Sequence, residues 1–272
     1  MGIVSHIAAD SRVAAAFPYH IASTQEDAMI ILYGAGPGFG LPDASPYSMK
    51  TAVQLRMAGL DFLVRPASPA QSPKGQLPFI DDDGELVADS TFIRLHLEWK
   101  YGFDLDAALD ARQRAEAWAI ERMVENHFGW TAAWPRYFLD RNLAHGAARF
   151  LEGVPQARRA AMIEALRSRV AADFRAVGLE GHEPDEIEWL GTRSLQSLSA
   201  ILGDKAYLMG DRPSGVDAIA FAQLAALLTP EFDSPLRLAA EGMLNLADYT
   251  DRMMARFYPD FVWSRSGILE PA

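Results

Sequence analysis

The sequence predicts an α/β domain followed by an all-α domain. Short β-like runs alternate with helix-like runs as far as about residue 105, and nearly every segment beyond that point has helical periodicity. An Asp83-Gly84 pair between two apolar runs indicates an antiparallel hairpin within the first part. With 272 residues, 50% of them hydrophobic, the chain is long enough to bury a core in each domain.

A four-stranded mixed sheet is predicted for the first domain. Its first two strands should be parallel because a helix crosses between them, whereas the hairpin makes the last two antiparallel. In chain order we expect a strand over 29–33, a helix over 46–58, strands over 61–65, 77–80 and 85–88, and a helix over 91–101.

The predicted helical domain is marked by apolar residues that recur at steps of three and four. These stripes begin at Ala115, Met162, Leu195, Val216 and Leu246. We place an N-terminal extension at residues 1–27, the α/β domain at 28–103 and the helical domain at 106–265.

The composition excludes several classes of function. Acidic residues outnumber Lys and Arg by 36 to 25, a net charge of −11, which argues against nucleic acid or an anionic membrane surface as the main partner. No run is long enough to span a membrane and no signal-peptide core precedes the first domain, so we expect a cytoplasmic protein. The absence of cysteine excludes disulfides and a cysteine nucleophile, and the six histidines lack metal-ligand spacing. Sulfur chemistry must therefore use a thiol that the protein binds.

A glycine-rich loop, residues 34–40, follows the first predicted strand, where such loops can cradle a phosphate. Its glycines alternate instead of following the G-x-G-x-x-G pattern, and it lacks the Gly-Lys-Ser/Thr ending of a P-loop. We therefore predict a flexible loop and no nucleotide site.

The motif S-P-Y-S at residues 45–48 opens the first predicted helix. Ser45 suits the N-cap and Pro46 the first helical position, so helix capping alone explains both residues. The Ser45 hydroxyl would also lie at the positive end of the helix dipole, where it would favour a bound thiolate over a thiol. Lowering a thiol pKa by about two units requires roughly 2.7 kcal/mol, which a charge-assisted hydrogen bond and a helix terminus can together supply.

Two further positions have both a structural and a functional interpretation. Pro78 begins a predicted strand, where proline is uncommon. Asp89 and Ser90 join the hairpin to the next helix and could cap it. They would equally suit an amino-acid zwitterion, with the carboxylate facing the ammonium group and the helix N-terminus facing the carboxylate.

Three motifs in order carry a specific resemblance. S-P-Y-S-x-K opens a helix at Ser45, K-G-Q-L-P precedes the hairpin at Lys74, and A-D-S precedes a helix at Ser90. Together they resemble the glutathione transferase superfamily, over about residues 28–260. The resemblance implies a thioredoxin-like N-terminal domain followed by the helical C-terminal domain of that superfamily.

The motif-bearing segments 45–56 and 74–97 are most similar to the failed-axon-connections and metaxin-like branch. The run 208–217 resembles the helix-start motif of the superfamily's C-terminal domain. There Ser214 caps the helix, and Asp217 returns a hydrogen bond to the capping backbone as in a capping box.

The resemblance implies a glutathione site and assigns a role in it to individual residues of this chain. Glutathione is the implied co-substrate, with Ser45 as the catalytic residue that faces its sulfur and Tyr33 as the fallback hydroxyl donor. Pro78 would be a cis-proline that frees the Leu77 backbone to pair with the cysteinyl part. The implied glutathione-binding residues are Leu77, Pro78, Asp89 and Ser90, the last two at the γ-glutamyl end, with Lys74 or Gln76 near the glycine carboxylate.

The second substrate would be an apolar electrophile bound between the domains. Four residues are predicted to line its pocket: Met123, His127, Trp130 and Trp134. Core packing explains these side chains equally well, and His127 is either a general acid or a packed imidazole.

We therefore predict a glutathione transferase-like enzyme that forms a homodimer. The alternatives are a non-catalytic binding or scaffold protein of the same fold and a glutathione-dependent peroxidase.

Overall fold

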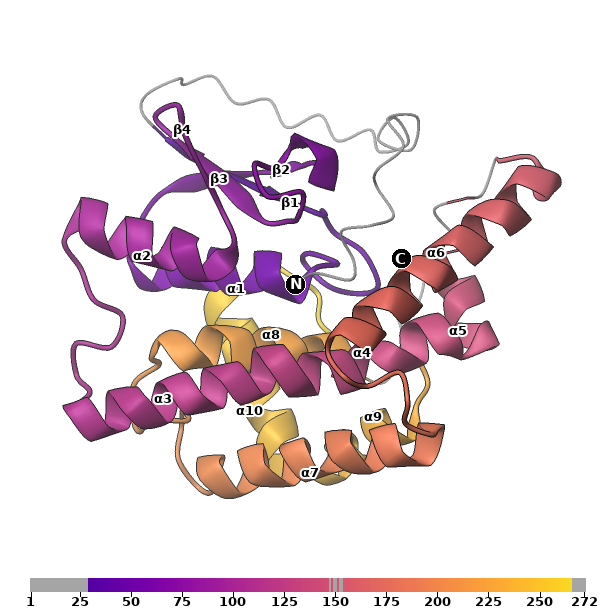
Figure 1. The fold of residues 1–272 in the computed structure, drawn as a ribbon. Helices are drawn as coiled ribbons and strands as arrows, with labels where there is room; N and C mark the ends of the chain where they lie inside the picture. The colour runs from indigo at the N-terminus through magenta and orange to yellow at the C-terminus, as the bar shows by residue number, and fades with distance from the viewer. Residues whose placement is uncertain (1–28, 147, 149–150, 152–153, 266–272) are drawn as a thin grey trace.

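The computed structural model describes residues 29–146, 148, 151 and 154–265 (Figure 1). The predicted extension over residues 1–27 lies outside them. The chain folds into a sheet layer covered by helices on the side that faces a larger helical domain, as Figure 1 shows. This arrangement confirms the predicted α/β plus all-α fold.

The sheet has four strands in the order β2-β1-β3-β4. They span β1 (Ile30–Gly34), β2 (Phe62–Pro66), β3 (Phe79–Asp82) and β4 (Glu85–Ala88). Strand β1 pairs with β2 in parallel and with β3 antiparallel, and β3 pairs antiparallel with β4, which confirms the predicted mixed sheet.

The hairpin between β3 and β4 turns at the predicted dipeptide. Asp83 and Gly84 have φ of 57° and 86°, the two left-handed residues that a type I′ turn needs. Strand β3 begins two residues later than predicted, at Phe79, because Leu77 and Pro78 form the cis peptide bond that precedes it.

Helix α1 (Pro46–Met57) is buried on two sides. Ala52 and Leu55 pack with the apolar side chains of β1, β3 and α2 (Ser90–Tyr101). Met49 and Val53 pack instead with the core of the helical domain. The N-terminus of α1 therefore lies where the two domains meet.

A short 3-10 turn, η3 (Pro69–Gln71), completes the first domain.

The helical domain begins with a helix that continues through a π-helix directly into a second helix. The helical domain contains α3 (Ala111–Met123), η4 (Val124–Phe128), α4 (Gly129–Phe138), α5 (Asp140–His145), α6 (Gln156–Ala176), α7 (Pro184–Leu202), α8 (Gly215–Leu228), α9 (Pro235–Gly242) and α10 (Leu244–Phe257).

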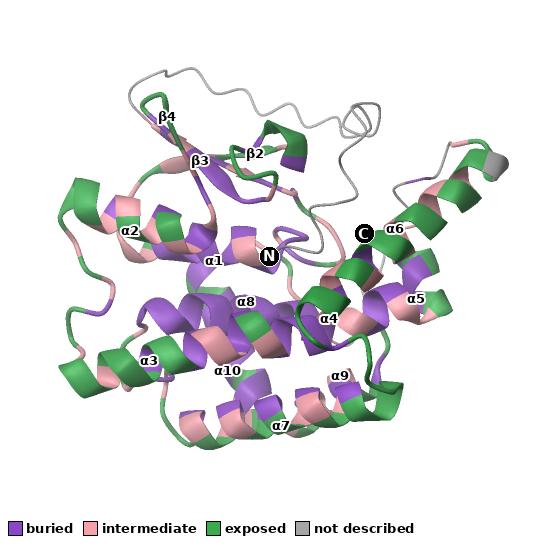
Figure 2. Ribbon diagram, in the orientation of Figure 1, coloured by how far each residue is buried: buried purple, intermediate pink, exposed green. Residues whose placement is uncertain are grey.

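Helix α8 forms the centre of this domain, and every one of its residues is buried (Figure 2). Its N-terminus has the predicted capping box, in which the Ser214 N–H donates to Asp217 Oδ2 at 2.8 Å. The Leu208 N–H and the Tyr249 hydroxyl donate to Asp217 Oδ1, both at 2.9 Å. Burial raises the pKa of Asp217 despite these bonds.

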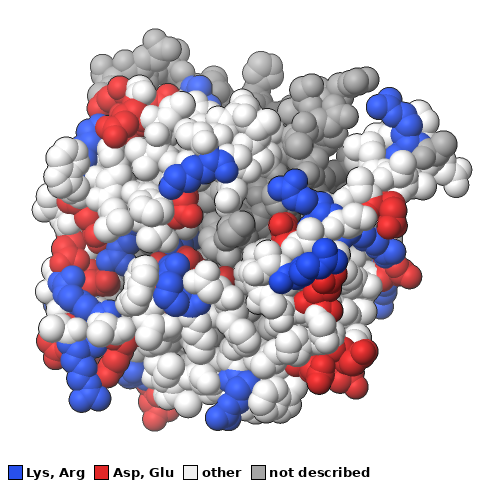
Figure 3. Space-filling model, viewed as in Figure 1, with Lys and Arg blue, Asp and Glu red and all other residues white. Residues whose placement is uncertain are grey.

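The charged surface is mixed on the face in view, where Lys and Arg side chains alternate with Asp and Glu (Figure 3). The net charge of −11 is therefore not gathered into a single patch on this face. Among the described residues, no helix is both long and apolar enough to cross a membrane.

Candidate functional site

Ser45 is the N-cap of α1, as predicted. Its backbone is extended (φ −98°, ψ 118°), and its Oγ accepts a long hydrogen bond of 3.4 Å from the Ser48 N–H. Pro46 occupies the first helical turn, where its missing N–H costs nothing. Ser45 is only 3% exposed, so its hydroxyl lies beneath the protein surface in this conformation.

The loop before Ser45 is organised around a buried carboxyl group. Asp43 Oδ1 accepts the Ser45 N–H at 2.8 Å, and its Oδ2 accepts the Gly36 N–H at 3.0 Å. Burial raises the pKa of Asp43 to about 7, against the lowering effect of these bonds. The backbone N–H groups that might have cradled a phosphate are thus directed at the protein's own carboxyl group.

The same loop corrects the prediction that residues 34–40 are flexible. The Gly38 and Leu41 backbones bond to each other, and Leu41 is buried in the core of the helical domain. The Thr229 hydroxyl, just after α8, donates to the Phe39 carbonyl at 2.5 Å. The loop is therefore a packed bridge between the two domains.

Gly34, at the end of β1, leaves the space that Asp43 occupies. A Cβ at this position would lie 2.3 Å from Asp43 Oδ2 and 3.0 Å from Ser48 Oγ. Any larger residue would therefore displace Asp43 and, with it, the loop that holds Ser45.

The other predicted site residues reach the same edge of the sheet through strand register. Phe79 pairs with Ala88 across the hairpin and with Tyr33 across the β1–β3 ladder. Pro78 therefore lies beside Asp89, at the edge where β1 ends and leads into the Ser45 loop. The Leu77–Pro78 peptide bond is cis, which confirms that prediction.

Asp89 has an unusual backbone conformation, φ 76° and ψ 125°, in a region that favours glycine. Its Oδ1 accepts the Thr91 N–H at 2.9 Å and caps α2, and its own N–H donates to the Pro78 carbonyl at 3.4 Å. Ser90 is buried. Strained residues of this kind persist where the surrounding structure holds them, often at binding sites.

Lys74 and Gln76 lie on the segment that leads into β3. Lys74 is exposed, and its ammonium lies 3.9 Å from the centroid of the Phe92 ring. Gln76 is partly buried, and Leu77 is buried beside Phe79. Their contact with glutathione stays a prediction.

Sequence reasoning missed a buried charge cluster that joins the domains. Lys50 of α1, fully buried, donates to Glu121 Oε1 at 2.9 Å and to Glu125 Oε1 at 2.5 Å. Arg122 bridges the same two carboxylates at 2.9 and 2.7 Å, and Thr91 Oγ1 lies 3.5 Å from the Lys50 ammonium. We call these five residues the Lys50 cluster. Its signal in the sequence was a lysine in the S-P-Y-S-x-K motif and a Glu pair four residues apart.

Tyr47 connects the site to this cluster. Its hydroxyl donates to the Glu125 carbonyl at 3.4 Å, and burial beside the Glu125 charge raises its pKa. Tyr33, the fallback donor, stacks on Phe79 with ring centroids 4.5 Å apart.

The four residues predicted to line the electrophile pocket pack against several parts of the structure. His127 Nδ1 lies 3.0 Å from the Ser194 hydroxyl of α7. Trp130 is buried edge-on against Phe174, Trp134 stacks on Phe138, and Met123 packs against the main core. The contacts of His127, Trp130 and Trp134 lie within the helical domain, whereas the cluster around Met123 also includes residues of α1. The role of these four residues in a pocket remains a prediction.

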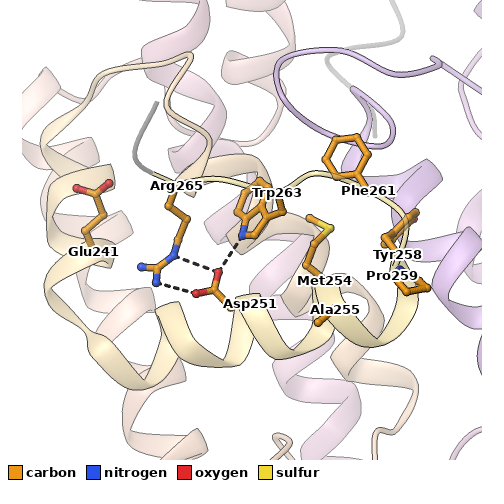
Figure 4. A pocket seen from close by; sticks show the side chains of 9 residues that line it. All are labelled: Glu241, Asp251, Met254, Ala255, Tyr258, Pro259, Phe261, Trp263 and Arg265. Carbon is orange, nitrogen blue, oxygen red and sulfur yellow. Dashed lines mark hydrogen bonds and ion pairs between the residues drawn. The ribbon is translucent and has the colours of Figure 1, made fainter. Parts of the chain in front are cut away.

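A pocket of about 710 Å³ lies elsewhere, between α10 and the segment that follows it (Figure 4). Asp251 accepts the Trp263 indole N–H at 2.8 Å and pairs with Arg265 at 2.7 Å. This pocket shares no lining residue with the Ser45 edge of the sheet.

The fold and this edge of the sheet define a protein of the glutathione transferase class. Residues 46–142 match the sequence profile of the glutathione S-transferase N-terminal domain, and residues 191–253 match that of the C-terminal domain. The chain belongs to the glutathione S-transferase family.

Its relatives include a glutathione S-transferase and also proteins that are not named as transferases. It is 30% identical over 248 residues to an isoprene-epoxide–glutathione S-transferase of Rhodococcus sp. strain AD45, covering 84% of this chain and 99% of that one. It is 32% identical over 265 residues to Failed axon connections of Drosophila melanogaster, covering 90% and 62%. Human metaxin-1 is 26% identical over 234 residues, covering 82% of this chain and 50% of that protein.

A solved structure of the same fold is the beta-etherase LigF from Sphingobium sp. strain SYK-6. The TM-score is 0.60 at 22% identity, over 84% of this chain and 96% of that one. At this identity, the likeness establishes the fold alone.

Proposed function

We propose that this protein is a glutathione transferase that binds glutathione at the Ser45 edge of the sheet and transfers its thiolate to an apolar electrophile. The observation that carries the proposal is the convergence of Ser45, cis-Pro78 and Asp89 at one sheet edge. The isoprene-epoxide–glutathione S-transferase among the relatives supports it.

The proposed mechanism depends on lowering the pKa of a thiol. The Ser45 hydroxyl would donate to the sulfur at the N-terminus of α1, where the helix dipole also favours negative charge. The Leu77 backbone would hold the cysteinyl part, while Asp89 and Ser90 would hold the γ-glutamyl end. Catalysis would consist of positioning the thiolate and stabilising its charge.

A non-catalytic binding or scaffold protein is the second candidate. The burial of Ser45 and Ser90, 3% and 4% exposed, favours it, as does the similarity to metaxin-1 and Failed axon connections. Calorimetric titration with glutathione and an aryl-halide conjugation assay separate the two. Binding with turnover supports the transferase, binding without turnover supports the scaffold, and no heat at millimolar glutathione contradicts the proposed site.

Asp89→Ala should weaken glutathione binding by about 10- to 100-fold, because the γ-glutamyl ammonium loses a charge-assisted hydrogen bond. The measurement is the Kd from calorimetry. Asp110→Ala is the matched control, since Asp110 caps α3 in the same way, accepting the Gln113 N–H at 2.8 Å, on an exposed surface away from the site. An equal Kd for Asp89→Ala and the wild type would contradict the assignment.

We also propose that two copies associate through one face of α2. Phe92, Leu95 and Trp99 form an apolar stripe at steps of three and four residues, and they are 54%, 55% and 83% exposed. Burying such a stripe against a second copy would remove it from water. Trp99→Glu should convert a dimer to a monomer in light scattering, whereas Trp189→Glu, on α7 and 66% exposed, should not. A monomeric wild type, or a dimer that survives Trp99→Glu, would contradict this interface.

A further inference from the structure

Asp43 carries a buried carboxyl group at the proposed thiolate site. It is 6% exposed, and among the described residues no Lys, Arg or His forms an ion pair with it. Its oxygens accept the backbone N–H groups of Ser45 and Gly36, and the Ser48 hydroxyl lies beside it. The carboxyl group therefore contacts the backbone of Ser45, the residue proposed to face the sulfur.

The groups that face Asp43 leave its charge uncompensated. On α1 the neighbouring side chain is the neutral Ser48 hydroxyl. After α10, burial together with the charge of Asp43 raises the pKa of the Tyr258 phenol to about 12, so the phenol stays neutral. The guanidinium of Arg56 lies beyond it, 4.2 Å from the centroid of the Tyr258 ring.

A thiolate at Ser45 would be a second negative charge beside Asp43. Two acids this close cannot both ionise freely, so they titrate as a pair that shares a proton. Since burial raises the pKa of Asp43 to about 7, this exchange falls in the neutral range.

We propose that Asp43 keeps the site at one negative charge, ionised when the site is empty and protonated when glutathione is bound as a thiolate. This inference rests on the proposed function. The S–H bond breaks and the sulfur keeps the electron pair, while an O–H bond forms on the Asp43 carboxyl group, the proton passing by exchange with solvent. Asp43 is thus a positioning residue, acting through the Ser45 N–H and through its own charge.

The test is the number of protons released when glutathione binds, obtained by calorimetry at pH 7.5 in two buffers of different ionisation enthalpy. The wild type should release fewer than about half a proton per glutathione, because Asp43 takes up the proton that the thiol loses. Asp43→Asn should release close to one proton, because no acceptor remains. Thiolate absorbance in the ultraviolet should confirm that both proteins bind the thiolate.

Asp217→Asn is the matched control. Asp217 is also a buried carboxyl group that accepts two backbone N–H groups, those of Leu208 and Ser214, but it caps α8. This variant should release as few protons as the wild type.

The outcomes separate the two proposals. Glutathione binding by the wild type with release of a full proton overturns the role of Asp43, and so does an equal release by wild type and Asp43→Asn. Since the wild type alone can overturn it, the test stands even where the variant does not fold. Absence of any glutathione binding by the wild type overturns the proposed function, and the role of Asp43 with it.

Discussion

Replacing Lys50 with methionine should lower the free energy of unfolding by about 3–5 kcal/mol, the usual cost of removing one partner from a buried ion pair. Methionine has a similar length but no charge. Glu121 and Glu125, only 5% and 7% exposed at their side chains, would keep Arg122 as a shared partner, and Glu121 would also keep Arg94 at 3.9 Å. Because the Lys50 cluster joins α1 to α3 and η4, the loss should fall on the contact between the domains. Denaturant unfolding measures it.

An exposed ion pair provides the comparison. Arg112 and Glu116 pair at 2.8 Å on α3, but their side chains are 87% and 49% exposed. Arg112→Met should therefore cost less than about 0.5 kcal/mol, as exposed pairs one helical turn apart do. Adding Glu125→Gln to Lys50→Met should restore part of the lost stability, because it removes one of the two buried carboxylates that have lost the lysine. A Lys50→Met protein as stable as the wild type would show that the cluster does not stabilise the domain contact.

Ser45→Ala should reduce kcat/KM for glutathione conjugation by about 10- to 100-fold while leaving most of the glutathione affinity. The lost hydrogen bond is to a charged sulfur, and such bonds contribute roughly 1.5–3 kcal/mol. Steady-state kinetics with an aryl halide and calorimetric binding of glutathione measure the two quantities separately. A fall in the rate without a fall in affinity is expected when the removed group acts on the reactive thiolate.

Ser45→Thr controls for the second role of this residue, because Ser45 also caps α1. Threonine keeps both a hydroxyl group and a capping oxygen, so it should retain most of the activity. Unchanged turnover in Ser45→Ala would remove Ser45 from the mechanism. Tyr33, the fallback donor, would then be the next residue to test. Loss of activity in Ser45→Ala together with unfolding of α1, visible by circular dichroism, would assign the effect to capping.

Local sequence patterns, together with the resemblance to the superfamily's helix-start motif at residues 208–217, predicted those parts of the fold that depend on near neighbours. Asp83-Gly84 turns the hairpin because both residues accept a positive φ, and Ser214 with Asp217 caps α8 because a capping box needs only three residues' spacing. Resemblance added the cis bond before Pro78, which no local pattern could have established, since most X-Pro bonds are trans.

Some residues of the candidate site could be predicted from sequence motifs and others could not. Ser45, Pro78 and Asp89 carried motifs, and the register of three strands brings them to one edge. Asp43 carried no motif, and its importance arises from the space left by Gly34 and from burial of the loop. The prediction of a flexible loop was wrong because it judged the glycines alone and not the contacts that Leu41 and Phe39 make with the helical domain.

Patterns among residues close together in the chain predicted the order of elements, the hairpin and the helix caps. The general rule for a helix crossover added the parallel pairing of the first two strands. Which charges are buried and which groups meet became known from the three-dimensional packing. Lys50 lies 71 and 75 positions from the two glutamates that it bonds. The energy of a charge depends on its solvent exposure and on such distant partners, and neither can be obtained from spacing along the chain.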